Sequence, residues 1–362
     1  MKKNILMVIT IMLFGFSNAQ LGDLLKQAGN KTKEKLEKKE GVILFQNKRG
    51  FSNYLECEDC GDIQQCPNCS ISLTYHQVSS ELRCHYCGYT KKTRNTCPSC
   101  GKIGLTSVGA GTQRIEEDLA NILSVHLPEK KVNISRLDLD STVHKGSHRK
   151  ILHDFAIGNT DILLGTQMVA KGLDFHRVAL VGVINADIQL NLPDFRASER
   201  TFQLLSQVAG RAGRSGQIKG EVIIQTRQTE RYAISSVINS DFKKFYDIEI
   251  KERQEVLFPP FVRYCVIEFS SIDGLKAENQ AQNFYKILPQ HESLIFFQPI
   301  PAPISKINKK YRWLISIKSI KAIDASGKYL RKAIKIALEK YNKNIATNSV
   351  NIKIDIDSYS SF

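Results

Sequence analysis

Short apolar runs alternate with longer mixed stretches through the middle of this 362-residue chain. Five runs rich in Val, Ile and Leu predict buried strands, and they cover 41–45, 132–137, 161–164, 178–184 and 221–225. Between them lie stretches with a helical pattern, near 113–126, 146–157 and 198–209. Strands that alternate with helices predict an α/β domain with a mostly parallel sheet and helices on its faces.

A second pattern begins near residue 259. Residues 262–269 and 312–318 are expected strands, and 350–356 alternates apolar and polar positions as a half-buried strand does. Residues 325–343 carry an apolar stripe at helical spacing, so this part predicts a small α+β domain. We therefore divide the chain into a leader at 1–20, a charged linker or helix at 21–40, an α/β domain at 41–56 and 101–235, a cysteine block at 57–100 and an α+β domain at 236–362.

The cysteine block holds eight of the nine cysteines, as the pairs Cys57 and Cys60, Cys66 and Cys69, Cys84 and Cys87, and Cys97 and Cys100. The C-x-x-C spacing is typical of structural zinc, and eight thiolates suffice for two closed Zn²⁺ sites. An iron–sulfur cluster and disulfides are the less favoured alternatives, and spacing alone leaves open which pairs share an ion. His76 and His85 are not needed as ligands, and Cys265 is expected to be a small buried side chain.

The amino terminus conflicts with this zinc prediction. Residues 1–20 resemble a secretory signal, with two lysines, an apolar run at 5–16 and a cleavage-like Ser17-Asn18-Ala19. Residues 26–40 are rich in Lys and Glu, which predicts a solvated helix or a disordered linker. An oxidising compartment would endanger zinc thiolates. We therefore expect a cytoplasmic protein with a leader that comes from a fusion or a misplaced start, and secretion is the minority interpretation.

The charge balance points to an acidic partner. Lys and Arg number 51 against 36 Asp and Glu, a net charge of +15 that suits a nucleic acid, an anionic membrane or an acidic protein. No apolar run reaches the roughly 18–20 residues of a membrane span, which argues against an integral membrane protein. Tyr311 and Trp313 predict either stacking on bases or core packing. Around them, one basic face or an ordinary solvated surface is expected from Lys306, Lys309, Lys310, Arg312, Lys328, Arg331, Lys332 and Lys335.

Two motifs of the α/β domain suggest chemistry. Residues 165–174 (GTQMVAKGLD) directly follow a predicted strand, and residues 207–214 (QVAGRAGR) end a predicted helix. Arg211 and Arg214 suit a γ-phosphate, because a guanidinium is planar and permanently charged. Residues 108–113 (VGAGTQ) resemble a phosphate loop, but a turn that caps the next helix is favoured, and the chain contains no G-x-x-x-x-G-K-[ST].

Other polar residues favour plain structural roles. His144, His148 and His153 are expected to be surface residues, and Asp138 and Asp140 to form a turn at the end of a strand.

The order of these motifs resembles the second RecA-like lobe of superfamily-2 helicases, where they are motifs V and VI. The resemblance sharpens to the PriA family of replication-restart helicases, in which four C-x-x-C pairs follow a strand of that lobe. Further similar segments lie at 109–113, 136–140, 194–200 (DFRASER), 259–261 (PPF) and 299–313, so that the resemblance covers about 41–358. It implies a RecA-like lobe 2 with an inserted two-zinc module and an α+β C-terminal domain.

The resemblance also implies a function. Members of the family use ATP to unwind duplex DNA 3′ to 5′ at abandoned replication forks and help to load the replicative helicase. It implies one zinc on Cys57, Cys60, Cys97 and Cys100 and another on Cys66, Cys69, Cys84 and Cys87. Nucleotide-binding residues are then Gly172, Asp174, Gln207, Arg211 and Arg214, the two arginines being catalytic, and DNA-facing residues are Thr166, Gln167 and Lys171. Implied partners of a monomeric chain are forked or single-stranded DNA, single-stranded DNA-binding protein and primosome or helicase-loading proteins.

The chain departs from the family in lacking the first lobe, with its Walker A lysine and D-E-x-H motif. ATP and Mg²⁺ bind between two lobes, so we expect this polypeptide alone not to hydrolyse ATP. The first alternative is a non-catalytic zinc module that binds DNA or primosome proteins. A secreted cysteine-rich protein is the less favoured alternative.

Overall fold

The computed structural model divides its described residues into two compact units. It describes residues 6–10, 31–46, 54–68, 71–76, 80–84, 87–94, 96–108, 112–138, 142, 146–166, 175–192, 194–213, 218–344 and 349–360. The first unit comprises 1–51, 110–192 and 196–248, and the second comprises 52–109, 193–195 and 249–362. The second unit thus groups the cysteine block with the C-terminal residues, and the five-part division drawn from the sequence stays a prediction.

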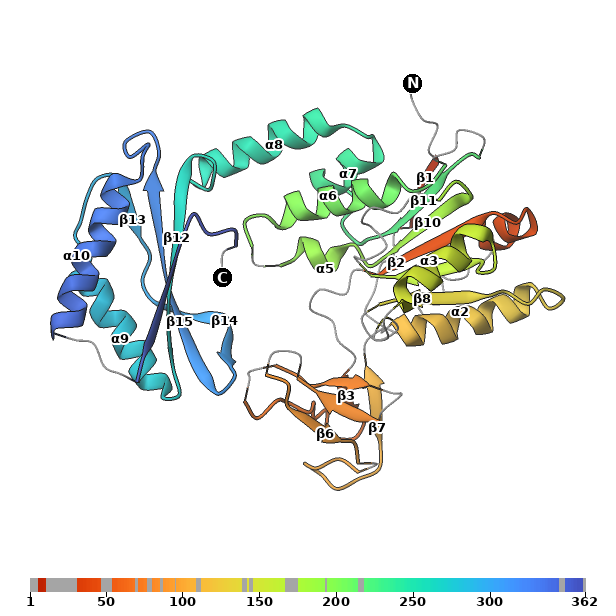
Figure 1. Ribbon diagram of the computed structural model, residues 1–362, viewed down its shortest axis with the longest axis horizontal. Coiled ribbons are helices and arrows are strands. Elements are labelled where there is room, and N and C mark those ends of the chain that lie inside the picture. Colours follow the sequence, from red (N-terminus) through yellow and green to blue (C-terminus); the bar gives the residue numbers. More distant parts are fainter. Residues whose placement is uncertain are drawn as a thin grey trace. The chain divides into compact units, whose positions relative to one another are not determined.

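The first unit is built on a wholly parallel sheet with the strand order β1-β11-β10-β2-β9-β8 (Figure 1). Its strands are β1 (Leu6–Thr10), β2 (Gly41–Gln46), β8 (Ile134–Leu137), β9 (Ile162–Gly165), β10 (Val178–Ile184) and β11 (Glu221–Gln225). Every residue of β10 is buried, as expected for a strand covered on both faces. The predicted α/β class is confirmed. β1 falls within the expected leader, and the fate of that leader stays a prediction.

Helices cover both faces of this sheet, because alternate strand residues point to opposite sides. Val42 and Leu44 face a core that includes α2 (Thr112–His126), whereas Ile43 and Phe45 face a core that includes α3 (Ser147–Ile157). α6 (Ala197–Ala209) and α7 (Tyr232–Ile238) also pack into the core that contains Ile43 and Phe45. The remaining helices of this part are α5 (Asp187–Leu190) and α8 (Phe242–Glu255), which runs on into the second unit.

The charged segment before β2 is part of this unit. Residues 31–37 are helical, Leu36 is fully buried, and Lys35 is only 5% exposed. Lys35 Nζ lies 3.1 Å from the carboxylate of Glu221, which Lys31 also pairs. Burial raises the pKa of Glu221, but hydrogen bonds from Lys31 and Lys35 outweigh burial and lower it. The expectation of a solvated helix was therefore wrong, because three buried positions lie among exposed charges.

Removing the Leu36 side chain should destabilise the first unit. We expect Leu36→Ala to lower the free energy of unfolding by about 2–5 kcal/mol, since it leaves a cavity in the core beside β2. Glu37→Ala, one residue on and exposed, should change it by less than about 0.5 kcal/mol. Urea denaturation checks both variants, and equal midpoints would contradict the buried placement of this helix.

The second unit contains a five-stranded antiparallel sheet, β13-β15-β12-β16, with β14 also paired to β15 (Figure 1). Its elements are α9 (Gly274–Ile287), α10 (Lys328–Asn344), β12 (Val262–Ser271), β13 (Leu294–Phe296), β14 (Ile300–Ile307), β15 (Lys310–Ile320) and β16 (Asn351–Ile356). Cys265, Ile267 and Phe269 of β12 face a core with α9 and α10, whereas Tyr264 and Val266 face a smaller cluster. The α+β expectation is confirmed, and burial raises the pKa of the Cys265 thiol to about 12.

The cysteine block folds into short antiparallel pieces. β3 (Tyr54–Cys57) pairs with β7 (Leu105–Val108), and a separate sheet contains β4 (Thr74–His76), β5 (Glu81–Arg83) and β6 (Thr90–Lys92). Among its described residues, the hydrophobic core has only five buried members, Leu55, Cys66, Leu73, Leu82 and Cys84. A core of this size does not stabilise a fold by itself. Over the part of the chain that the structure describes, no helix has both the length and the apolar character needed to cross a membrane.

Candidate functional site

Tight turns bring the two cysteines of each pair together. Gly61, Gly88 and Gly101, each four residues after the first cysteine of a pair, donate their N–H groups to the carbonyls of Cys57, Cys84 and Cys97 at 2.8–2.9 Å. All three glycines have φ between 70° and 74°, a region that side chains disfavour. The left-handed backbone at this position therefore explains why a glycine follows each of these three C-x-x-C pairs. The pair at Cys66 has Ser70 at this position, outside the described residues.

The turns assemble two groups of sulfur atoms. Cys57, Cys60, Cys97 and Cys100 form one group (the outer cluster), and Cys66, Cys84 and Cys87 form another (the inner cluster), with the ligand atoms of each within 4.8 Å of one another. Cys69, the fourth predicted ligand of the inner cluster, lies outside the described residues.

The spacing of these sulfurs fits a tetrahedral metal ion. The Sγ–Sγ separations are 3.7 Å for Cys57–Cys100 and Cys60–Cys97 and 3.6 Å for Cys66–Cys87. Four sulfurs at the usual Zn–S distance stand about 3.8 Å apart, whereas a disulfide needs about 2.05 Å. The described cysteines of the two clusters are accordingly free and grouped as zinc ligands are, so the disulfide alternative is wrong for them.

One thiol of the outer cluster, that of Cys97, has a lowered pKa. Backbone N–H groups of Cys100 and Ser99 lower the pKa of the Cys97 thiol to about 7, so the thiolate is accessible near neutral pH. Cys57 and Cys97 are buried, while Cys60 and Cys100 are exposed. A bound zinc would supply structural cross-linking here, because a group of four protein thiolates leaves no open position for catalysis.

The motif after β9 lies at the carboxyl edge of the parallel sheet. Thr166 directly follows β9, and its N–H donates to the carbonyl of Leu137 at the end of neighbouring β8 (3.4 Å). Asp138, the first residue after β8, is buried, which agrees with the expected role in a turn at a strand end. The structure therefore brings Thr166 and Asp138 to one edge of the sheet.

The arginine motif lies at the opposite edge. α6 ends at Ala209, and the N–H of Gly213 donates to the carbonyl of Val178, the first residue of β10 (2.9 Å). Gly213 has a φ of 64°, and a Cβ there would meet the backbone nitrogen of Gly220 at 2.6 Å. Arg211, in the same turn, is half-buried and its Nε atom is shielded from solvent. The sequence analysis did not identify Gly220 as part of this turn. The only signal in the sequence is that a glycine directly precedes β11.

The structure describes some of the other predicted residues. His148 and His153 lie on α3 and are both exposed, which confirms their expected surface positions. Trp313 packs against the core of the C-terminal sheet, and Gln207 is exposed near the end of α6. Outside the described residues lie Gly109, Gly111, Asp140, His144, Gln167, Lys171, Gly172, Asp174 and Arg214, and the described part of His76 and Gln113 is backbone only. The roles of these residues stay predictions.

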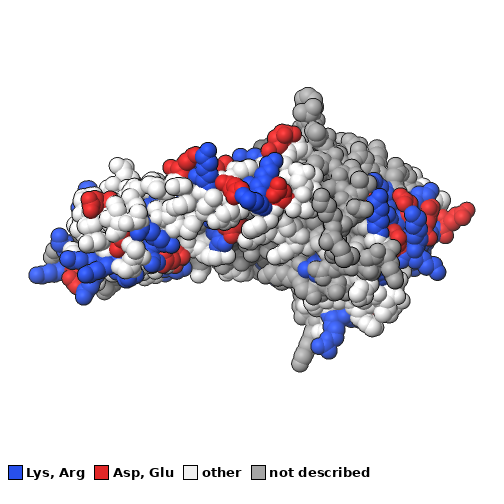
Figure 2. Space-filling view, turned by 90° about the horizontal axis from the view of Figure 1, so that it is seen from above, with Lys and Arg blue, Asp and Glu red and all other residues white. Residues whose placement is uncertain are grey.

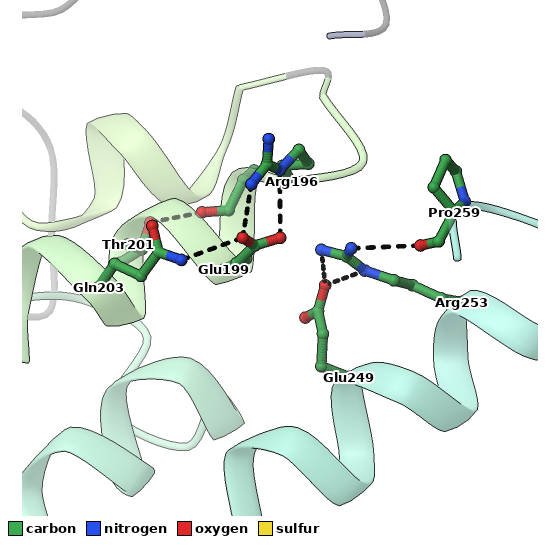
Figure 3. A network of polar contacts seen from close by, with 8 residues as sticks. Arg196, Glu199, Thr201, Gln203, Glu249, Arg253 and Pro259 are labelled. Atoms are coloured by element: carbon green, nitrogen blue, oxygen red, sulfur yellow. Dashed lines mark hydrogen bonds and ion pairs between the residues drawn. The ribbon is translucent and has the colours of Figure 1, made fainter. Parts of the chain in front are cut away.

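The residues of the DFRASER segment (194–200) are divided between the two units and make separate contacts in each. In the first unit, Arg196 forms a bidentate pair with Glu199 (2.6 and 3.1 Å), which also accepts from Gln203 (Figure 3). In the second unit, Asp194 accepts a hydrogen bond from Ser360 (2.8 Å), and Phe195 stacks on Phe258 with ring centres 5.0 Å apart. At these residues the motif therefore makes contacts inside each unit.

The second unit has its own ion pair near the start of the C-terminal sheet. Arg253 pairs with Glu249 at 2.6 Å and donates to the carbonyl of Pro259 at 3.3 Å (Figure 3). This pair links the end of α8 to the turn before β12. None of these three residues was singled out from the sequence for this role.

Polar residues that join β10 to β11 were also missed. The N–H of Asn185, which has a φ of 53°, donates to Gln225 Oε1 at 3.1 Å. Asp187 accepts from the N–H of Arg227 at 2.8 Å and from the Thr226 hydroxyl. The signal was available, because polar residues directly follow a fully apolar strand. They hold two carboxyl strand ends together at the edge that carries Thr166.

The basic residues of the C-terminal domain fall into two groups. Arg312 is paired with Glu268 at 2.7 Å, and Lys306 lies over the ring of Tyr311 at 4.9 Å. The exposed side of α10 is strongly basic, with Lys328, Arg331, Lys332, Lys335, Lys340 and Lys343 against Glu339 alone. Figure 2 shows Lys and Arg side chains gathered at the end of the second unit that carries α10. The eight basic residues named from the sequence therefore do not form one uniform face, because Arg312 is paired with an acid and the exposed cations gather on α10.

Comparison with known proteins agrees with this arrangement. Residues 66–92 match the PriA DNA helicase Cys-rich region domain, 110–216 the helicase conserved C-terminal domain and 254–359 the primosomal protein N C-terminal domain. The replication restart protein PriA of Bacillus subtilis is 40% identical over 331 residues, 91% of this chain. The Haemophilus influenzae protein is 36% identical over 343 residues, 94% of this chain.

The chain belongs to the PriA family. It spans only 40% of the Bacillus subtilis protein and 45% of the Haemophilus influenzae protein. The matched domains assign it to the C-terminal portion of PriA, with a RecA-like helicase lobe, a Cys-rich zinc region and an α+β domain. Among solved structures, the Mycobacterium smegmatis helicase Lhr aligns over 67% of this chain and 22% of its own, with a TM-score of 0.37 and 13% identity.

Proposed function

We propose that this chain supplies the second lobe, the zinc region and the C-terminal domain of an ATP-dependent 3′–5′ DNA helicase that acts in replication restart. The observation that best supports this is the placing of two motifs at opposite edges of one sheet, Thr166 at the carboxyl edge and Arg211 with Gly213 at the amino end of β10. A motor needs nucleotide and DNA sites that are separate but joined by a rigid element. A packed parallel sheet is such an element.

The amino edge of β10 is the proposed nucleotide side. Arg211 and Arg214 are proposed to stabilise the charge that spreads over the γ-phosphate oxygens in the transition state. Gly172, Asp174 and Gln207 lie beside the nucleotide in this proposal. The 362 residues contain no P-loop motif, so binding of ATP and Mg²⁺ requires a first lobe.

The carboxyl edge is the proposed DNA side. Thr166, Gln167 and Lys171 are proposed to contact phosphates of a single strand, as hydroxyl, amide and ammonium groups commonly do. Forked DNA is the proposed substrate in a cytoplasmic setting. Single-stranded DNA-binding protein and helicase-loading proteins are the proposed protein partners.

An ATPase assay tests the nucleotide side. The chain alone should release no phosphate above the blank with forked DNA. Fused to the part of Bacillus subtilis PriA that it does not cover, it should show turnover that Arg214→Ala lowers by about 10³-fold or more. Arg149→Ala, an exposed arginine of α3, is the matched control and should leave turnover unchanged. Turnover by the chain alone that Arg214→Ala abolishes would refute the need for a first lobe.

A second candidate function, DNA binding without catalysis, is favoured by the basic side of α10. Its exposed positions carry six cations and one anion. Such a face attracts phosphates regardless of base sequence, so the affinity should fall steeply with salt.

Charge removal on α10 should weaken DNA binding and its salt dependence. We expect the triple change of Lys328, Lys332 and Lys335 to Gln to reduce the slope of log affinity against log salt by about 3. The same change at Lys243, Lys244 and Lys251, exposed on α8, alters net charge equally and should reduce the slope by less than about 1. Fluorescence anisotropy with a forked oligonucleotide checks both. Equal slopes for the two triple variants would remove α10 from the binding surface.

A further inference from the structure

A hairpin of the C-terminal sheet reaches the cysteine block within the second unit. Its strands β14 and β15 pair Lys306 with Tyr311 and Ile307 with Lys310. The two residues between, Asn308 and Lys309, have φ values of 50° and 66°. This is the conformation of a two-residue type I′ turn, which most side chains disfavour. We call residues 306–311 the brace.

The brace contacts the loop of the inner cluster. The N–H of Lys309 donates to the carbonyl of Asn68 at 2.6 Å, and Lys306 Nζ lies 3.4 Å from the carbonyl of Pro67. Ile307 packs against the hydrophobic cluster that contains Cys66 and Cys84. The left-handed conformation of Lys309 thus directs its N–H toward the carbonyl of Asn68.

Asn68 in turn holds two sulfur atoms of the inner cluster. Its backbone N–H donates to Cys66 Sγ at 3.4 Å, and its side-chain Nδ2 donates to Cys87 Sγ at 3.7 Å. Hydrogen bonds to metal-binding sulfurs orient them and commonly alter metal affinity by about 10- to 100-fold. A continuous set of contacts therefore runs from the C-terminal sheet through Asn68 to Cys66 and Cys87.

The outer cluster is built differently. Its pair Cys97-Pro98-Ser99-Cys100 repeats the pattern Cys66-Pro67-Asn68-Cys69, but serine replaces the asparagine whose amide reaches a second sulfur. Cys60 and Cys100 are also exposed, whereas Cys66 and Cys84 are buried. A competing chelator therefore has easier access to the outer sulfurs.

We propose that the brace positions Asn68 over the inner cluster, so that the C-terminal domain makes this cluster release its metal more slowly than the outer one. Asn68 is a positioning residue in this proposal, because it acts through Cys66 and Cys87. The chain then contains one labile and one retained metal site. The proposal does not depend on nucleotide or DNA chemistry.

Zinc release to a chromogenic chelator tests the proposal on the full chain. We expect two phases of equal amplitude, with rates at least about tenfold apart. A variant with Cys57→Ser and Cys60→Ser should keep only the slow phase. In that background Ile307→Asp should accelerate release about tenfold or more, whereas Ile300→Asp, an exposed position of the same strand, should not change it.

A second pair of variants covers the case in which Ile307→Asp disturbs folding. Asn68→Ser makes the inner pair identical to the outer C-P-S-C sequence and should accelerate only the slow phase, by about tenfold. Ser99→Asn is the reciprocal control and should leave the slow phase unchanged. Circular dichroism verifies that each variant keeps its fold. A single release phase, a faster inner site, or a slow phase that Asn68→Ser leaves unchanged would each overturn the proposal.

Discussion

Loss of one outer cysteine should remove one of two zinc ions. We expect the purified, reduced chain to contain two zincs per molecule, and Cys97→Ser or Cys100→Ser to contain one. Cys265→Ala is the matched control, because Cys265 lies in the C-terminal core, outside both clusters, and should leave two. Elemental analysis of the desalted protein gives the count directly.

The physical reason is that zinc binding and folding of the cysteine block are one process. Its described core of five members is too small to order residues 54–108 alone, and a structural zinc contributes about 10–16 kcal/mol of apparent binding energy at neutral pH. Chelation should therefore unfold the block while the two larger sheets remain. Rapid tryptic cleavage at Lys91, Lys92 and Lys102 after chelation would report the unfolding. Two zincs retained by Cys97→Ser, or slow cleavage after chelation, would contradict the zinc assignment.

Most strands of the two larger sheets could be predicted because their signal is local, whereas β1, β13 and β14 were not predicted. β10 is apolar or glycine at all seven positions and was predicted to the residue, and β2 was placed to within one residue of its end. β14 was missed because two prolines interrupt its sequence, which an edge position tolerates since β14 pairs with β15 alone among the described strands. α9 was missed because small residues, Ala277 and Ala281, form much of its buried side.

Contacts between distant parts of the chain could not be predicted from local pattern. The helix at 31–37 looks solvated, because the partner of its lysines is Glu221, 190 residues away from Lys31. The contact between Lys306 and Pro67 spans 239 residues. Likewise, the motifs around Thr166 and Arg211 were recognised from sequence order. Only the strand topology shows that they lie at opposite edges of the sheet.

The largest effect expected from a substitution in the first unit is that of Gly213→Ala. A Cβ at Gly213 would lie 2.6 Å from the nitrogen of Gly220 and 2.9 Å from both its Cα and the Ile218 carbonyl oxygen. These are backbone atoms, so no flexible side chain can move aside. The φ of 64° adds a second penalty of about 1–2 kcal/mol. We expect Gly213→Ala to lower the free energy of unfolding by about 3–5 kcal/mol.

Two further glycines separate these causes. Gly146 has a φ of 93°, and a Cβ added there would meet no atom within 4 Å, so Gly146→Ala carries only the backbone penalty of about 1–2 kcal/mol. Gly220 has no left-handed φ, but its Cβ would lie 2.5 Å from the carbonyl carbon of Ala212, so Gly220→Ala carries only the clash. Urea denaturation should rank Gly213→Ala as most damaging, with Gly220→Ala next. Because the turn also carries Arg211, both clash variants should abolish turnover in the fused protein while Gly146→Ala retains it. A Gly213→Ala protein as stable as Gly146→Ala would show that the turn between α6 and β11 can open to admit a side chain.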